Sequence, residues 1–175
     1  VSANLAAVCI VSRWLEANIN DYLAAVPLLL PGDAPLKPVL YVGNEFEDDR
    51  VAQAEPPPKS PALYVLWDAP AAVTPELATN THRDYEGLVI SVRVMLEKPS
   101  HDAKAMRTLD YYGRAVIRCL RALLDNSEAP ERELLGIELV AATGLTFTPF
   151  QDDAPGDILS GAVLVTLFLR DWSPT

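Results

Sequence analysis

Hydrophobic positions near the start of the chain predict a long helix. From residue 3 to residue 26, apolar side chains recur at intervals of three and four, which is the spacing of a helix with a buried face. Ser2 or Asn4 can cap its first turn. Pro27 follows, and because proline cannot continue a helix, we expect the helix to stop there.

A second helix is predicted over residues 101–125, with Ser100 or Asp102 as its cap. At 100° per residue its apolar side chains fall on a single stripe. The stripe consists of Met106, Leu109, Gly113, Val116, Ile117, Leu120, Leu123 and Leu124.

Alternation of apolar and polar positions predicts strands elsewhere. The clearest strand covers residues 86–97, where every second residue from Leu88 to Leu96 is apolar, while Ser91 and Arg93 point to the other face. Further strands are predicted at residues 39–42, 63–67, 137–142 with an extension to 147, and 160–170.

Proline-rich and acidic segments separate these elements. We interpret residues 44–61 and 68–84 as long loops, since their prolines disfavour regular structure. Residues 45–49, within the first of them, form an acidic run that we expect to be an exposed loop. A second acidic loop is predicted at residues 149–156, between the last two strands.

The predicted order of elements is α-β-β-β-α-β-β. Strands grouped around one central helix favour an α+β fold over alternating βα units. We therefore expect a single domain covering residues 1–175, with a mostly antiparallel sheet flanked by the N-terminal helix and the long central helix.

Composition and charge restrict the class of protein. The net charge of −10 argues against sequence-specific nucleic-acid binding, because that affinity depends on neutralising phosphates. No apolar run reaches the roughly 18–20 residues of a membrane helix, and the apolar start is predicted to be a helix rather than a signal peptide.

Cys9 and Cys119 lie in apolar helical patterns, which indicates buried free thiols and a reducing compartment.

A search for catalytic, metal or cofactor chemistry gives no candidate. His82 and His101 are far apart, and neither has a Cys or His neighbour at the spacing of a metal site. The paired acids lie in polar loops, where solvated charge is the ordinary explanation. Phosphate-binding glycine loops and nucleophile motifs are missing from the sequence. We therefore expect no enzyme activity, no metal and no cofactor.

The strongest functional signal is a basic stripe along the second helix. The stripe consists of Lys104, Arg107, Arg114, Arg118 and Arg121. One interpretation is that these cations pair with acids of the same chain, such as Asp110 and Asp125. Another is a contact face whose complement is an acidic loop of a neighbouring copy, which gives a head-to-tail interface. A third is contact with the DNA backbone, which the overall acidity disfavours. The candidate acidic contacts are Glu45, Glu47, Asp48, Asp49, Asp152 and Asp153.

The succession of segments along nearly the whole chain has a recognisable pattern. A helix is followed by a proline-rich strand pair, then by a long strand that leads into one long helix, and finally by two strands split by an acidic loop. The stretches concerned are Leu15-Glu16-Ala17-Asn18-Ile19, Pro38-Val39-Leu40-Tyr41-Val42, Pro61-Ala62-Leu63-Tyr64-Val65, Gly87-Leu88-Val89-Ile90-Ser91-Val92-Arg93-Val94, Leu145-Thr146-Phe147-Thr148-Pro149-Phe150-Gln151-Asp152-Asp153 and Gly161-Ala162-Val163-Leu164-Val165-Thr166-Leu167. In this order the chain resembles tail terminators and closely related neck proteins of tailed phages.

The resemblance implies a structural virion protein without catalytic residues. Proteins of this family assemble into a hexameric ring that caps the tail tube and meets the head-side neck proteins. The expected partners are therefore copies of the chain, the tail tube protein and a head-side neck or connector protein, in a virion assembled in the host cytoplasm. Another neck, head-completion or stopper protein is an alternative, as is a small-ligand-binding or adaptor domain.

Overall fold

The computed structural model describes residues 2–71, 85–97, 103–126, 128–134, 137–149 and 158–171. Apolar alternation and helical periodicity along these segments produce a layer of helices on a sheet. In chain order the elements are α1 (Ala3–Ala24), β1 (Tyr41–Asn44), α2 (Asp49–Ala52), β2 (Ala62–Ala71), β3 (Tyr85–Glu97), α4 (Ala103–Asp125), the 3-10 helix η1 (Pro130–Arg132), β4 (Glu133–Leu134), β5 (Ile137–Pro149) and β6 (Ile158–Asp171).

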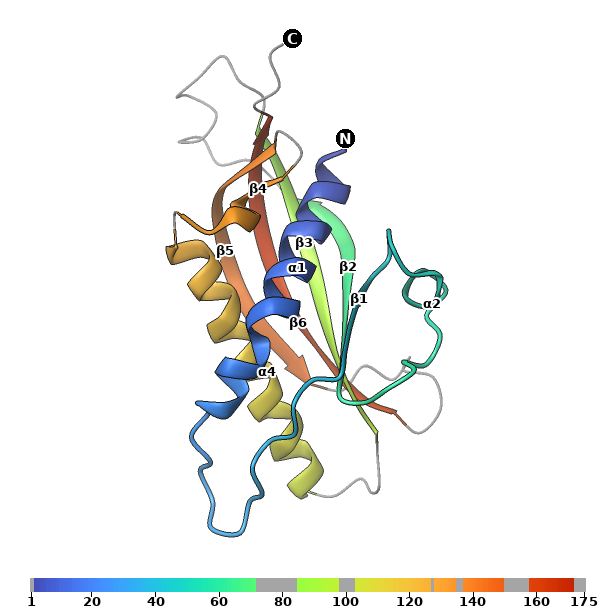
Figure 1. Cartoon of the computed structure of the whole chain (residues 1–175), viewed down its shortest axis with the longest axis vertical. Helices are drawn as coiled ribbons and strands as arrows, with labels where there is room; N and C mark the ends of the chain where they lie inside the picture. The colour runs from blue at the N-terminus through green and yellow to red at the C-terminus, as the bar shows by residue number, and fades with distance from the viewer. Residues whose placement is uncertain are drawn as a thin grey trace.

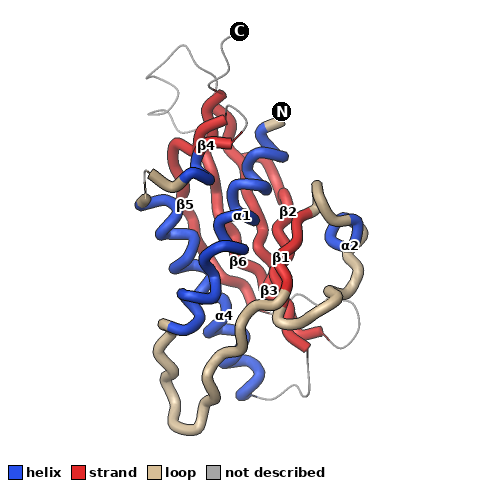
Figure 2. Tube along the Cα trace, in the orientation of Figure 1, coloured by secondary structure: helices blue, strands red, loops and turns tan. Residues whose placement is uncertain are grey.

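The described strands form one sheet in the order β1-β2-β3-β6-β5-β4. Neighbouring strands are antiparallel except β1 and β2, which are parallel. Helices α1 and α4 lie side by side on one face of this sheet (Figures 1 and 2). The α+β class and the mostly antiparallel sheet flanked by two long helices are therefore confirmed.

The period-two pattern of β3 determines which of its residues enter the core. Leu88, Ile90, Val92, Val94 and Leu96 are all buried in the cluster beneath the helices. On the opposite face, Met95 joins a second and smaller buried cluster with Tyr64 of β2 and Val51 of α2. The short helix α2 thus supplies an apolar side chain to the face of the sheet that α1 and α4 do not cover.

Helix α1 is buried around most of its circumference. Every residue from Ala6 to Ser12 is buried, although these seven successive positions point in all directions around the helix axis. The helix contacts α4 on one side and the sheet beneath, with η1 and β1 beside it. A helix that is apolar all round is expected where neighbours enclose it, which explains the weak amphipathicity of this segment.

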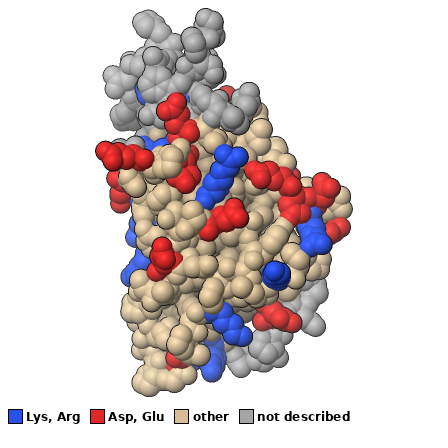
Figure 3. All heavy atoms as spheres, viewed as in Figure 1, with Lys and Arg blue, Asp and Glu red and all other residues tan. Residues whose placement is uncertain are grey.

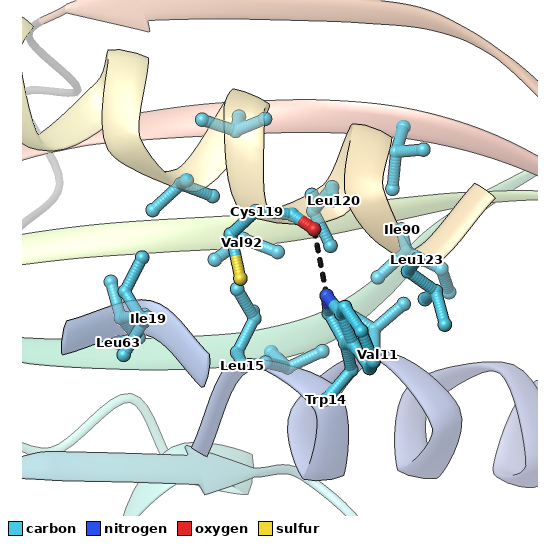
Figure 4. Packing of buried hydrophobic residues seen from close by; sticks show 14 of the residues in the cluster. Val11, Trp14, Leu15, Ile19, Leu63, Ile90, Val92, Cys119, Leu120 and Leu123 are labelled. Atoms are coloured by element: carbon cyan, nitrogen blue, oxygen red, sulfur yellow. Dashed lines mark hydrogen bonds between the residues drawn. The ribbon is translucent and has the colours of Figure 1, made fainter. Parts of the chain in front are cut away.

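Two hydrogen bonds fix α1 against its neighbours. The indole Nε1 of Trp14 donates to the carbonyl oxygen of Cys119 in α4 at 2.7 Å, in a buried position (Figure 4). On the other side, the amide Nδ2 of Asn44 at the end of β1 donates to Ser12 Oγ at 3.1 Å, also buried. Buried polar groups need such partners, so these bonds set the position of α1 within the apolar contacts.

A close contact between α4 and the sheet depends on two glycines. Phe147 of β5 lies between Gly113 of α4 and Gly161 of β6, and a Cβ atom added at either glycine would lie within 2.8 Å of its ring. Glycine costs stability in a helix interior because of its backbone freedom. At residue 113 it is needed because only a residue without a side chain leaves room for the phenyl ring.

Several predicted boundaries and elements are wrong. Strand β1 begins at Tyr41 rather than residue 39, and residues 68–71 of the predicted loop at 68–84 belong to β2, while residues 72–84 lie outside the described residues. Pro70 fits in β2 because β1 pairs only as far as Val65, so the outer edge needs no amide donor there. Helix α2 and the two-residue β4 were not predicted, since both are too short to show a period.

The exposure of Met106 also differs from the prediction. The stripe on α4 is confirmed for Leu109, Val116, Leu120 and Leu123, which are buried, whereas Met106 is 39% exposed. The first turns of α4 lie beside the loop that follows α1, at the end of the molecule away from the start of α1 (Figure 1). Met106 therefore meets this loop rather than the centre of the core.

We expect Gly113→Ala to destabilise the fold by about 1–3 kcal/mol, because the added methyl group overlaps the ring of Phe147. At an open helix position the same change would stabilise by about 1 kcal/mol, so the sign of the effect is informative. Urea unfolding measures it. The double variant Gly113→Ala with Phe147→Leu should recover part of the loss, and a single variant more stable than the wild type would contradict the contact.

Candidate functional site

The basic stripe predicted from the sequence lies on the outward side of α4. We call Lys104, Arg107, Arg114, Arg118 and Arg121 the basic face. All of these residues except Arg107, which is half-buried, are exposed. The Nε atom of Arg114 lies 3.7 Å from Asp110 Oδ2, and since both side chains are more than half exposed, this pair contributes little to stability. Within the described part of the chain, the other three exposed cations form no ion pair.

Arg107 is engaged inside the chain. Its Nη2 lies 2.9 Å from Asp33 Oδ1, and the Asp33 side chain is only 6% exposed. The Tyr111 hydroxyl donates to Asp33 Oδ2 at 2.7 Å. Hydrogen bonds from Arg107 and Tyr111 lower the pKa of Asp33, which keeps its carboxylate charged. Pairing within the chain thus applies to two residues of the basic face: Arg114 pairs with Asp110, as predicted, and Arg107 pairs with Asp33, which was not predicted.

These contacts anchor the loop after α1 to α4. The Tyr111 hydroxyl accepts a hydrogen bond from the Leu29 amide at 3.0 Å, and the Tyr112 hydroxyl donates to the Lys37 carbonyl oxygen at 2.6 Å. Burial raises the pKa of Tyr112 to about 12, so its hydroxyl keeps its proton at neutral pH. The loop is therefore held at both of its ends by α4.

The anchored loop and α4 border a shallow, open apolar groove of about 410 Å³. Leu29 and Leu30 are 63% and 48% exposed. Their side chains lie beside Met106, so three large apolar residues are accessible in one place. The apolar groove is lined by Leu29, Leu30, Met106, Arg107, Asp110 and Tyr111.

The acidic run 45–49 is an ordered turn rather than a free loop, and we call it the acidic turn. Asn44 Oδ1 accepts hydrogen bonds from the amides of Phe46 and Glu47 at 3.0 and 3.1 Å. Asp48 Oδ1 accepts from the Arg50 amide at 2.9 Å and so caps α2, which starts at Asp49. The predicted exposed loop is thus a turn whose backbone path is fixed by these local bonds, and its last residue, Asp49, begins α2.

Two carboxylates of the acidic turn also bind other elements. Glu45 Oε1 accepts from the Trp67 amide of β2 at 2.5 Å, and the thiol of Cys9 donates to Glu47 Oε1 at 3.4 Å. The turn is therefore attached both to the sheet and to α1. Asp152 and Asp153, the other predicted acidic contacts, lie outside the described residues.

The basic face and the acidic turn lie on opposite sides of the molecule. Helix α4 contacts β5 and β6, toward one edge of the sheet, whereas the acidic turn follows β1 at the other edge. Acidic side chains gather beside α2, with a basic side chain among them, and basic side chains appear along the opposite edge, where α4 lies; further acidic side chains lie on that edge near η1 and β4 (Figure 3). A subunit with opposite charges on opposite sides can bind a copy of itself head to tail.

Cys9 and Cys119 are free and buried, as predicted. Burial is the main reason that the pKa rises to about 11 for Cys9 and to about 12 for Cys119, so both remain protonated thiols. The described segments hold no cluster of three potential metal ligands, and no helix in them is long and apolar enough to cross a membrane.

No protein-family model matches the chain, and no curated protein matches it either.

We expect Asp33→Asn to lower the free energy of unfolding at neutral pH. In the folded state the pKa of Asp33 is lowered from its usual value of 3.8. The charged carboxylate therefore stabilises the fold at pH values above 3.8, and this contribution is lost as the pH falls through the folded-state pKa. The difference between variant and wild type should therefore shrink in urea titrations performed successively at about pH 7, 4 and 3. Asp110→Asn, which removes only an exposed pair, should have a smaller effect. A pH-independent difference would show that the charge of Asp33 is not what stabilises the loop.

Proposed function

We propose that this chain is a structural protein of a phage tail or neck, a tail terminator whose copies form a ring. The ring would cap the tail tube and connect it to the head-side neck proteins. The order of sequence segments supports this role, since it resembles that of tail terminators. The α+β fold, with a sheet covered by an N-terminal helix and one long central helix, agrees with what the resemblance implies.

The observation that carries the proposal is the separation of charge across the sheet. The basic face lies toward the β5 side and the acidic turn toward the β1 side. If the acidic turn of one subunit meets the basic face of the next, every subunit uses both surfaces once. A repeated head-to-tail contact closes into a ring when its rotation divides a full turn. A two-fold dimer through either surface would instead place like charges opposite each other.

The proposed role explains why charges of one sign remain together on α4. Like charges spaced four residues apart in a helix, such as Arg114 and Arg118, destabilise the helix mildly. Within the described residues, only Arg107 has a buried carboxylate partner, so pairing inside the chain accounts for a part of the basic face. Arg114 has the exposed partner Asp110, and contact with acidic groups of a neighbouring copy gives Lys104, Arg118 and Arg121 a partner as well. The copies would assemble in the host cytoplasm and remain in the virion.

The proposal predicts a closed oligomer, either in solution or on the tail tube. Light scattering coupled to size exclusion, with and without purified tube, measures the mass. We expect the double variant Arg114→Glu, Arg118→Glu to weaken assembly by at least about tenfold, since close charge pairs across an interface contribute on the order of 1.5 kcal/mol or more. Both residues are exposed, so the fold should remain intact.

A matched control is Arg13→Glu with Lys59→Glu, which changes the net charge equally at two exposed positions away from the basic face. This variant should assemble like the wild type. A wild-type chain that stays monomeric both alone and with tube would overturn the proposed function. Equal weakening in both double variants would show that net charge, rather than the basic face, controls assembly.

A further inference from the structure

Each of the two charged surfaces contains an exposed apolar feature. Phe46 is at the centre of the acidic turn and is 47% exposed. Beside the basic face, the apolar groove exposes Leu29, Leu30 and Met106. Stable protein interfaces commonly have an apolar centre with a polar rim, and both surfaces have this composition.

The phenyl ring of Phe46 is carried by a rigid backbone. The Phe46 amide is bonded to Asn44 Oδ1, and the residues on both sides of the turn are attached to β2 and α1 through Glu45 and Glu47. The ring is therefore presented with little conformational freedom to lose on binding. Rigid aromatic side chains surrounded by charged groups are frequent anchors in interfaces.

The apolar groove is held in place by the contacts that anchor its loop. The Leu29 amide is bonded to Tyr111, and Asp33, four residues further along, is bonded to both Tyr111 and Arg107. On the same helix, Lys104 lies two residues before Met106, and Arg114 lies about one turn after Asp110. Of the charged groups lining the groove, Arg107 is bonded to Asp33, and the carboxylate of Asp110 lies beside Arg114, so Lys104 and Arg114 are the cations that the rim offers to a ligand with an apolar side chain flanked by carboxylates.

We propose that Phe46 of one copy inserts into the apolar groove of the next copy, with the acidic turn lying against the basic face. This inference rests on the proposed head-to-tail ring and specifies its contact. The occupant is a second copy because the same chain provides both the acid-flanked aromatic ring and the base-flanked groove, on opposite sides of the sheet. Phe46 is 47% exposed, so its insertion would bury the accessible half of its surface and give the contact an apolar centre.

The edge of the sheet beside the acidic turn offers a poor alternative contact by strand addition. Glu45 already accepts the Trp67 amide on the outer side of β2, and Pro70 has no amide to donate. A register shift between Trp67 and Ala69 further interrupts this edge. Such features block pairing with an additional strand, so side chains are the groups available for contact on this side.

The test uses two variants of the whole chain that each lose one half of the contact. Phe46→Ser removes the ring, and Met106→Asp places a charge in the groove. Both positions are substantially exposed, so folding should be preserved and is checked by circular dichroism. We expect each variant alone to associate roughly 30-fold or more weakly than the wild type, as for a central aromatic anchor. Phe46→Leu and Met106→Leu, which keep apolar side chains, should assemble.

Mixing the two variants gives the decisive measurement. The Phe46→Ser chain retains an intact groove and the Met106→Asp chain retains Phe46, so one contact can form between the two chains. No third chain can add, because the dimer has neither a free Phe46 nor a free intact groove. Light scattering should show a 1:1 dimer in the mixture and monomers in each separate sample. A mixture that remains monomeric would overturn the pairing of Phe46 with the groove. Variants that assemble like the wild type would also overturn it while leaving the ring in place, whereas a monomeric wild type, alone and on tube, would overturn both.

Discussion

The enclosure of α1 is the constraint on which the rest of the structure depends. Seven successive residues from Ala6 to Ser12 are buried, so the helix needs neighbours on all of these sides. The sheet covers one side, α4 a second, and β1 a third. The buried bonds of Trp14 to Cys119 and of Asn44 to Ser12 connect α1 to two of these neighbours. Loosening α1 would therefore affect both the packing of α4 and the position of β1.

This arrangement decides which surfaces remain accessible. Because α1 occupies the centre of the helical layer, α4 lies toward β5, and its outward side is left to the basic face. The loop after α1 must then cross the start of α4, where Tyr111 and Asp33 hold it. The apolar groove is a direct consequence of that crossing, and β1 holds the acidic turn at the other side.

Charged groups at both surfaces stabilise the fold as well as being available for contact. Asp33 and Arg107 hold the loop, while Glu45 and Glu47 attach the acidic turn to β2 and α1. A carboxylate that accepts one hydrogen bond can still accept others, so these roles are compatible. The consequence is that both proposed contact surfaces are rigid, which reduces the entropy lost when two copies associate.

The sequence by itself determined the elements whose pattern is local. The alternation from Leu88 to Leu96 gave β3 its buried face, helical spacing gave α1 and α4, and the basic face followed from the same spacing on α4. Only the tertiary structure decided that Arg107 binds Asp33 and that Met106 is exposed.

The parallel pairing of β1 with β2 and the short helix α2 were likewise settled by the tertiary structure. The reason is physical: periodicity reports which residues share a face of one element. Partners far apart along the chain are selected by how the elements pack, and packing leaves no local period in the sequence.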